Sequence, residues 1–151
     1  MSKNEEKFEE FLKQNHIEYE RPDNQNYFID NVPFNKNGKY RPDFYLPQKK
    51  LYIEVKGEMT LRTVSILKYL LNKRLPNNFC ILQMTSELWI QKIYNDEKYS
   101  SNARKISASV EQQFEEIKNM SAKKLHDLSV KRLEEYVEFF KERYRKWCTK
   151  K

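Results

Sequence analysis

The sequence predicts an α/β fold over residues 1–100 and a helical extension over residues 101–151. In the first part, short runs rich in β-branched and aromatic residues alternate with stretches whose apolar residues recur every three or four positions. After residue 100 only the helical spacing continues. A chain of 151 residues can bury roughly 68–70% of its unfolded surface, so we expect one core and an accessory segment.

The first predicted element is a helix over residues 2–15. Ser2 or Asn4 can cap its N-terminus, and an acidic first turn complements the helix dipole. The apolar residues that define its core-facing side fall at helical spacing, namely Phe8, Phe11 and Leu12.

Three strands are predicted to follow this helix. The first covers residues 27–32 and the second residues 40–46. Pro42 lies inside the second run, and because proline cannot donate a ladder hydrogen bond, it should mark a strand start, an edge or a bulge. Residues 51–55 give the clearest strand, which is apolar and β-branched and is stopped by Gly57.

A helix and one more strand complete the predicted core. Apolar residues recur at helical spacing over residues 59–74, and Pro76 follows shortly after. Residues 79–84 predict a buried strand, and Thr85 or Ser86 starts a short helix. The predicted order is therefore α-β-β-β-α-β, followed by helix.

The extension predicts two amphipathic helices, the second of which Ser121 can cap. The apolar stripe of the first contains Ile106, Val110, Phe114 and Ile117. The stripe of the second contains Leu133, Val137, Phe140, Tyr144 and Trp147. Three interpretations stay open for these stripes: packing against the core, pairing in a homodimer, or docking to another protein.

The charge is unevenly distributed along the chain. There are 29 Lys and Arg residues against 22 Asp and Glu residues, a net charge of +7 with both His neutral. Residues 1–100 hold 16 basic and 14 acidic side chains, whereas residues 101–151 hold 13 and 8. The positive balance favours a polyanionic partner, and most of the excess lies in the extension.

The composition also excludes several classes of protein. No apolar run approaches ~18 residues, so no membrane span is expected. The N-terminus is polar and acidic, so we expect neither a secretory signal nor a transit peptide. Cys80 and Cys148 lie far apart without metal-ligand spacing, which predicts two reduced thiols in a cytoplasmic protein.

The residues most informative about chemistry are two acids and a lysine on successive strands. Asp43 and Glu54 are joined by a tight turn, so antiparallel pairing would bring their side chains together. Glu54 and Lys56 lie two positions apart on one strand and project from the same face. Buried carboxylates are costly unless a divalent cation binds them, and the Val55 carbonyl is placed to add a backbone ligand.

This arrangement predicts the hydrolysis of phosphodiester bonds. A divalent cation held by Asp43 and Glu54 would polarise a phosphoryl oxygen and lower the pKa of a bound water. Lys56 would orient that water or stabilise the developing negative charge.

A further acid is expected from the first helix. At about 100° per residue, Glu5 lies about 65° from the core-facing direction and Glu9 about 105°. Glu6 and Glu10 point towards the opposite face. Glu5 is therefore the first candidate for an acid that reaches the sheet, and Glu9 is the second.

The order of these residues resembles the PD-(D/E)xK nuclease superfamily, through Pro42-Asp43 and then Glu54-Val55-Lys56. Within it, the stretch is most similar to the bacteriophage endonuclease I type of Holliday-junction resolvase and to related small phage and restriction-like endonucleases. The resemblance covers about residues 2–85 and includes the blocks EEKF, IEYE, PDFYLP and EVKG.

The resemblance implies a restriction-endonuclease-like core, which is a mixed sheet flanked by helices. It implies that Asp43 and Glu54 bind Mg²⁺ or Mn²⁺, that Glu5 is catalytic and also serves the metal, and that Lys56 is the motif lysine. The implied activity is that of a metal-dependent DNA endonuclease of phage or mobile-element type, acting in the cytoplasm of a bacterial host.

Two departures from the family leave the junction specificity open. Glu58 follows the EVKG block where an aromatic or basic residue is usual, and the extension has no counterpart in the family. The alternatives are a site-specific or nicking endonuclease, or a non-catalytic DNA- or protein-binding factor that keeps the fold. The extension would then serve a homodimer or bind a phage or host protein. The cations expected to contact DNA are Lys39, Arg41 and Lys68.

Overall fold

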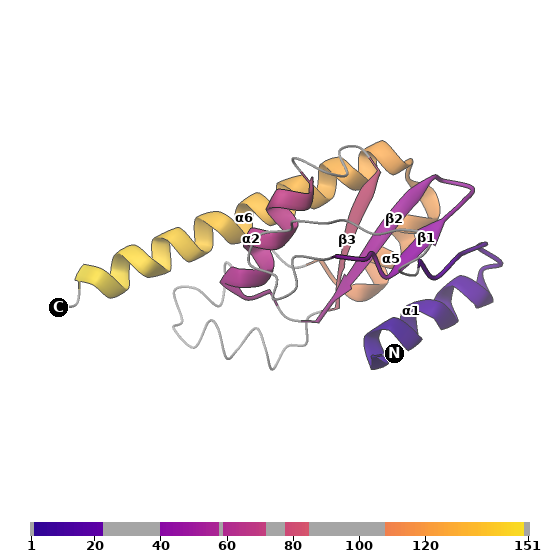
Figure 1. The fold of residues 1–151 in the computed structure, drawn as a ribbon, viewed down its shortest axis with the longest axis horizontal. Coiled ribbons are helices and arrows are strands. Elements are labelled where there is room, and N and C mark those ends of the chain that lie inside the picture. The colour runs from indigo at the N-terminus through magenta and orange to yellow at the C-terminus, as the bar shows by residue number, and fades with distance from the viewer. Residues whose placement is uncertain (1, 23–39, 58, 72–77, 85–107, 150–151) are drawn as a thin grey trace.

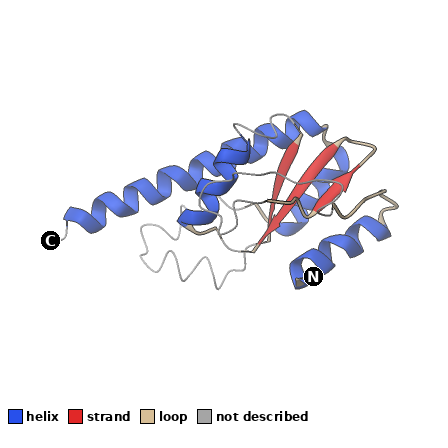
Figure 2. Ribbon diagram, viewed as in Figure 1, coloured by secondary structure: helices blue, strands red, loops and turns tan. Residues whose placement is uncertain are grey.

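The computed structural model describes residues 2–22, 40–57, 59–71, 78–84 and 108–149. Within these ranges the chain has an α/β fold, in which helices pack around a small three-stranded sheet (Figures 1 and 2). The elements in chain order are α1 (Lys3–Gln14), β1 (Phe44–Leu46), β2 (Leu51–Lys56), α2 (Leu61–Tyr69), β3 (Phe79–Gln83), α5 (Val110–Asn119) and α6 (Ala122–Thr149).

The sheet is mixed, and its strands follow the order β1-β2-β3. β1 and β2 are antiparallel, with Phe44 opposite Ile53, and a tight turn over residues 47–50 joins them. β2 and β3 are parallel, with Glu54 opposite Ile81. The antiparallel pairing predicted for the two acid-bearing strands is therefore confirmed.

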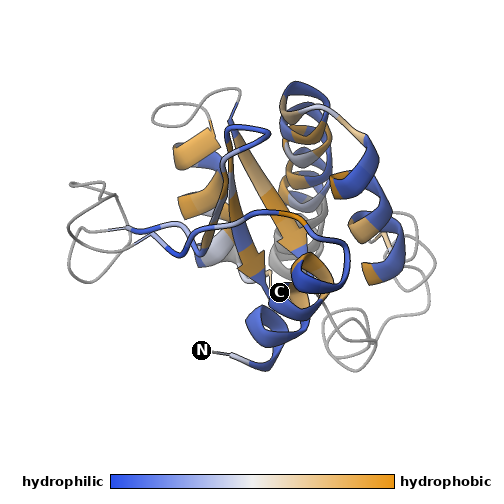
Figure 3. Cartoon of the chain, turned by 90° about the vertical axis from the view of Figure 1, so that its right-hand side faces the viewer, coloured by the Kyte–Doolittle hydropathy of each residue, from blue (hydrophilic) through white to orange (hydrophobic). Residues whose placement is uncertain are grey.

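Two apolar clusters occupy the two faces of the sheet, and the apolar strands lie between helices (Figure 3). Residues of α1, α5 and the start of α6 belong to the first cluster, and residues of α2 and the middle of α6 belong to the second. Successive residues of a strand point to opposite faces, so alternate residues enter the same cluster. Ile53 and Val55 of β2 belong to the first cluster, and Phe79 and Ile81 of β3 belong to the second. The stripe predicted for α1 is buried in the first cluster, as Phe8, Phe11 and Leu12.

Side chains of α5 and α6 cover the outer edge of β3. Gln113 binds both backbone groups of Gln83, since its Oε1 accepts from the N–H at 2.8 Å and its Nε2 donates to the carbonyl at 2.6 Å. Ser129 Oγ accepts from the Ile81 N–H at 2.9 Å. These contacts give hydrogen-bond partners to backbone N–H and C=O groups that would otherwise be unpaired at the edge of the sheet. α5 and the first part of α6 therefore pack against the sheet.

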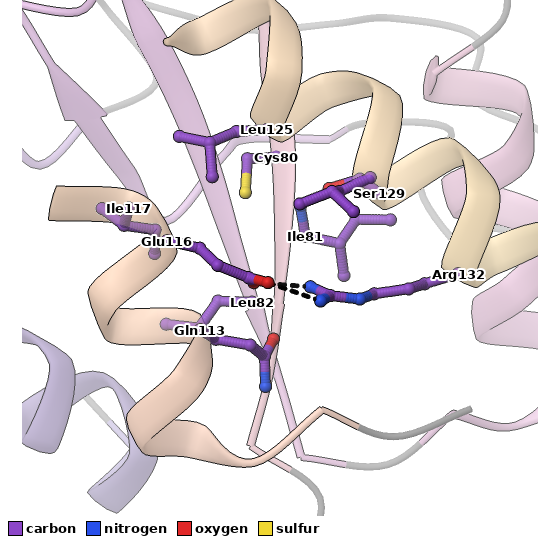
Figure 4. Close-up of a pocket in the computed structure, with 10 residues that line it drawn as sticks. Cys80, Ile81, Leu82, Gln113, Glu116, Ile117, Leu125, Ser129 and Arg132 are labelled. Carbon is purple, nitrogen blue, oxygen red and sulfur yellow. Dashed lines mark hydrogen bonds and ion pairs between the residues drawn. The ribbon is translucent and has the colours of Figure 1, made fainter. Parts of the chain in front are cut away.

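A largely buried ion pair joins α5 to α6. The Arg132 guanidinium donates to both carboxylate oxygens of Glu116, at 2.8 and 2.7 Å (Figure 4). The pair lines a cavity of about 10 Å³ beside β3, room for about one water molecule. Burial raises the pKa of the Cys80 thiol in the same lining to about 11, so this thiol stays protonated. His126 Nδ1 lies 3.1 Å from the Phe79 carbonyl oxygen, which gives this histidine a structural partner.

The C-terminal half of α6 runs on beyond the sheet (Figure 1). Leu133 and Tyr136 are buried against α2, and Val137 is partly buried there. Homodimer formation and docking to another protein stay predictions. No helix in the described part of the chain is long and apolar enough to cross a membrane. The side chains of the remaining predicted stripe lie outside the description, namely Phe140, Tyr144 and Trp147.

Several predicted boundaries shift in the structure. The helix predicted over residues 59–74 begins at Leu61, because the Thr60 side chain caps it by accepting a backbone N–H. β1 begins at Phe44, two residues after Pro42, which agrees with a proline that marks a strand start. Other predicted segments lie outside the described residues, over residues 27–32, 72–74 and 85–107.

Candidate active site

Asp43 lies directly before β1, where the chain enters the hairpin. Its Oδ2 accepts a hydrogen bond from the Val55 N–H of β2 at 2.8 Å. In an antiparallel ladder, the N–H and C=O of one residue leave the strand on the same side. The Val55 carbonyl, predicted as a backbone ligand, therefore leaves β2 on the side of Asp43.

Glu54 lies within β2 and is only 4% exposed. The Tyr40 hydroxyl donates to its Oε2, and the Lys56 Nζ lies 3.3 Å from its Oε1. Glu54 and Lys56 thus meet on one face of the strand, as their spacing predicts. Burial, opposed by the Lys56 ammonium, raises the pKa of Glu54 to about 7.

Glu5 reaches the hairpin from the first turn of α1. It forms a capping box with Ser2, whose N–H donates to Glu5 Oε2 at 2.8 Å while the Glu5 N–H donates to Ser2 Oγ at 3.1 Å. The other carboxylate oxygen, Oε1, lies 3.3 Å from Arg21 Nη2. The Glu5 carboxyl is also hydrogen-bonded to Asp43. The helix acid ranked first by its angle is therefore beside the hairpin acid.

This hydrogen bond moves the pKa values of Glu5 and Asp43 apart. Burial raises the pKa of Asp43, and the hydrogen bond to Glu5 raises it further, to about 7. The Val55 N–H and the Lys56 ammonium act in the opposite direction, because both stabilise the ionised carboxylate. Burial also raises the pKa of Glu5, but the hydrogen bonds from Ser2 and Asp43 and the charge of Arg21 outweigh it and lower the value to about 2. Glu5 and Asp43 therefore titrate as a coupled pair, in which the pKa of Asp43 is raised and that of Glu5 is lowered.

The site therefore contains three carboxyls, from Glu5, Asp43 and Glu54. The neighbouring cations do not offset the cost of burying all three as anions. Burial destabilises the anions of Asp43 and Glu54, so both titrate near neutral pH. A bound cation would stabilise both anions and displace their protons.

The oxygen donors of the site suit a hard divalent cation. Mg²⁺ is usually held by one or two carboxylates, while waters and substrate phosphates complete its shell. Asp43 and Glu54 provide two carboxylates, and Val55 provides a carbonyl oxygen. Among the described residues, no three His, Cys, Asp or Glu side chains are arranged to hold an ion on their own. An ion here would depend on water and substrate oxygens for the rest of its shell.

Gly57 allows α1 to approach the end of β2. A Cβ atom at this position would stand 2.7 Å from Asn4 Nδ2, closer than real Cβ contacts come. The absence of a side chain at residue 57 thus leaves room for the end of the Asn4 side chain, in the turn of α1 that carries Glu5. The sequence predicted Gly57 only as a strand stop.

Arg21 is a site residue that the sequence did not reveal. Glu20 exchanges two backbone hydrogen bonds with Tyr45, at 2.8 and 2.9 Å, and so holds the segment after α1 beside β1. The Arg21 guanidinium then lies 4.1 Å from the centre of the Phe44 ring and reaches Glu5. Arg21 is 16 residues from Glu5 in the sequence, and no short-range pattern joins them.

The remaining candidate residues lie outside this cluster or outside the description. Glu9, the second choice of helix acid, lies 3.4 Å from Lys13 Nζ along its own helix. Arg41 is exposed near the start of the hairpin, and Lys68 lies in the last turn of α2. Lys39 lies outside the described residues. Their contacts with DNA stay predictions.

No family model, curated protein or solved structure matches this chain. The relation to PD-(D/E)xK nucleases thus stays a resemblance in the motif.

Proposed function

We propose that the protein is a metal-dependent endonuclease that hydrolyses phosphodiester bonds in DNA. The observation that carries this proposal is the pair of acids, Asp43 and Glu54, at the open end of the β1–β2 hairpin. Lys56 Nζ lies 3.3 Å from Glu54, and Glu5 joins Asp43 from α1. These are the residue types that phosphodiester hydrolysis needs, in the order of the PD-(D/E)xK motif.

Each residue has a role in this proposal. Asp43, Glu54 and the Val55 carbonyl would hold Mg²⁺ or Mn²⁺, which would supply a Lewis acid and lower the pKa of a nearby water. The Lys56 ammonium orients the attacking water or stabilises the negative charge that develops on the phosphate. Glu5, whose carboxyl lies beside Asp43, would supply a further oxygen ligand to the metal shell once the proton between the two carboxyls is displaced.

DNA is the proposed substrate because it is a dense polymer of phosphates. The chain carries a net charge of +7; exposed Arg21 is paired with Glu5, and exposed Arg41 lies two residues before Asp43 in the sequence. Such cations position a nucleic-acid backbone through salt-sensitive contacts. Junction-resolving specificity follows only from the resemblance to endonuclease I-type resolvases, and site-specific or nicking activity competes with it. Cleavage of a four-way junction compared with a matched duplex separates these activities.

The test is incubation of the purified protein with branched, linear and supercoiled DNA in Mg²⁺, Mn²⁺ or EDTA. We expect cleavage with either metal, none in EDTA, and none from Asp43→Asn. Glu10→Gln is the matched control, because Glu10 is an exposed acid of α1 that contacts Gln14 and should leave cleavage unchanged. Failure to cut every substrate, or full cleavage by Asp43→Asn, would refute the proposal.

A non-catalytic DNA- or protein-binding factor is the second candidate. It is favoured by one observation, that no three metal-binding side chains are arranged to hold an ion within the described ranges. This candidate predicts binding that is unchanged by Glu54→Gln and Lys56→Ala, together with no cleavage in any metal. Measuring binding and cleavage on the same samples distinguishes it from the nuclease.

A further inference from the structure

Gln83 is a buried polar residue that the proposed chemistry does not use. It is the last residue of β3 and is 4% exposed. β2 and β3 are parallel, and Gln83 lies opposite Lys56 in their register. Paired residues of neighbouring strands point to the same face, so the Gln83 side chain leaves the sheet on the face of Lys56 and Glu54.

The side-chain oxygen of Gln83 lacks a hydrogen-bond partner. Oε1 is buried and is paired with no atom of the described residues. The strand cannot easily move to find a donor, because Gln113 binds the Gln83 N–H at 2.8 Å and its carbonyl at 2.6 Å. Buried polar atoms are nearly always paired, so an unpaired acceptor on a fixed strand calls for a donor that arrives in another state of the site.

Lys56 is the donor whose partners change when the site is loaded. Its ammonium has three N–H groups, and its Nζ lies 3.3 Å from Glu54 Oε1. A cation bound by Glu54 would compete with the ammonium for the same carboxylate oxygens. The acceptor nearest to Lys56 in the sheet is then Gln83, which holds the register position directly opposite on the same face.

We propose that Gln83 is a positioning residue whose amide oxygen holds the Lys56 ammonium when a metal ion is bound at Glu54. This inference rests on the proposed function and deepens it. One N–H of Lys56 is then fixed, and two remain for the water and a phosphate oxygen.

The first test follows the Lys56 ammonium by NMR in the full chain labelled with ¹⁵N, with and without Mg²⁺. We expect slow hydrogen exchange at Lys56 in Mg²⁺, exchange on the order of 10-fold faster in Gln83→Leu, and recovery in Gln83→Glu, which keeps an acceptor. Lys7, an exposed lysine of α1, is the internal control. If Lys56 in the unmodified protein exchanges as fast as Lys7 in Mg²⁺, the proposal is wrong, whatever the variants do.

The second test measures the kinetics of DNA cleavage at one pH. Gln83→Leu should lower kcat about 10- to 100-fold with little change in KM for DNA, whereas Gln83→Glu should recover most of it. Gln83→Met replaces the leucine variant if that variant does not fold.

The outcomes separate this inference from the proposed function. Equal losses in the Leu and Glu variants would show that Gln83 only supports the strand, and unchanged kinetics in Gln83→Leu would show that it plays no part. If the unmodified protein cuts no DNA, the endonuclease proposal fails alone, since the exchange rate of Lys56 in Mg²⁺ still decides whether Gln83 holds it.

Discussion

Replacing Glu54 by glutamine should stabilise the metal-free protein at alkaline pH. Glu54 is 4% exposed, and burial raises its pKa from 4.5 to about 7. Because the pKa is higher in the folded chain than in the unfolded chain, this carboxyl contributes stability that is complete below about pH 4.5 and is lost as the pH rises through about 7. At about 1.4 kcal/mol per unit of pKa, the buried anion costs about 3 kcal/mol at pH 8.

Glutamine preserves the shape of Glu54 and cannot ionise. The Tyr40 hydroxyl can still donate to its amide oxygen, while the Lys56 side chain, which is 34% exposed, loses a carboxylate but reaches water. We therefore expect Glu54→Gln to gain about 2–3 kcal/mol at pH 8 in EDTA. For a chain of 151 residues this corresponds to a rise in Tm of roughly 4–12 °C. At about pH 4 the two proteins should unfold at nearly the same temperature.

Thermal unfolding followed by circular dichroism at both pH values, in EDTA and in excess Mg²⁺, checks this prediction. Mg²⁺ should raise the Tm of the unmodified protein at pH 8 and leave that of Glu54→Gln almost unchanged, because an ion stabilises only the fold that binds it. Glu10→Gln removes an exposed acid and should shift neither value. A Glu54→Gln variant that is less stable at pH 8 in EDTA, or that shifts Tm equally at both pH values, would show that the buried carboxylate is not costly.

Three further substitutions test how the site and the extension are built. Gly57→Ala should change stability by less than about 1 kcal/mol in urea unfolding, because the new Cβ meets only the end of the flexible Asn4 side chain, and a larger loss that Asn4→Ala fails to relieve would contradict this. Arg132→Met should lower the free energy of unfolding in urea by about 3 kcal/mol, because it leaves the Glu116 carboxylate unpaired. Adding Glu116→Met should recover most of this loss, and no recovery would mean that the ion pair itself stabilises the fold. Gln113→Leu should lower the free energy of unfolding by about 3 kcal/mol and speed amide hydrogen exchange in β3, because it leaves the N–H and C=O of Gln83 unpaired. Unchanged exchange would show that Gln113 does not protect this strand edge.

The hairpin and its acids were predictable because their signals are local. A tight turn at residues 47–50 fixes the pairing of β1 with β2, and pairing decides which residues meet. The two-residue spacing then placed Glu54 and Lys56 on one face. Glu5 was also within reach of the sequence, because the buried stripe of α1 sets the direction of the core and the angle of each acid follows from it.

Contacts between distant segments were not predictable in the same way. Gln113 and Ser129 reach β3 from 30 and 48 residues further along the chain. On an amphipathic helix such polar side chains look like solvent-facing positions, since their role depends on which strand the helix lies beside. The contacts of Gln83 and the pairing of Arg21 with Glu5 could not be predicted for the same reason. In the sequence, Gln83 is only one polar residue within a buried strand.

The covered edge of β3 has a consequence for the order in which the chain can safely fold. During synthesis, β3 emerges before the helices whose side chains pair with its backbone, so the sheet edge stays open until about residue 129 has emerged. An open edge is a template for pairing with other chains. By covering this edge, α5 and α6 should limit aggregation. A chain cut after residue 100 should therefore self-associate, even though it keeps Glu5, Asp43, Glu54 and Lys56.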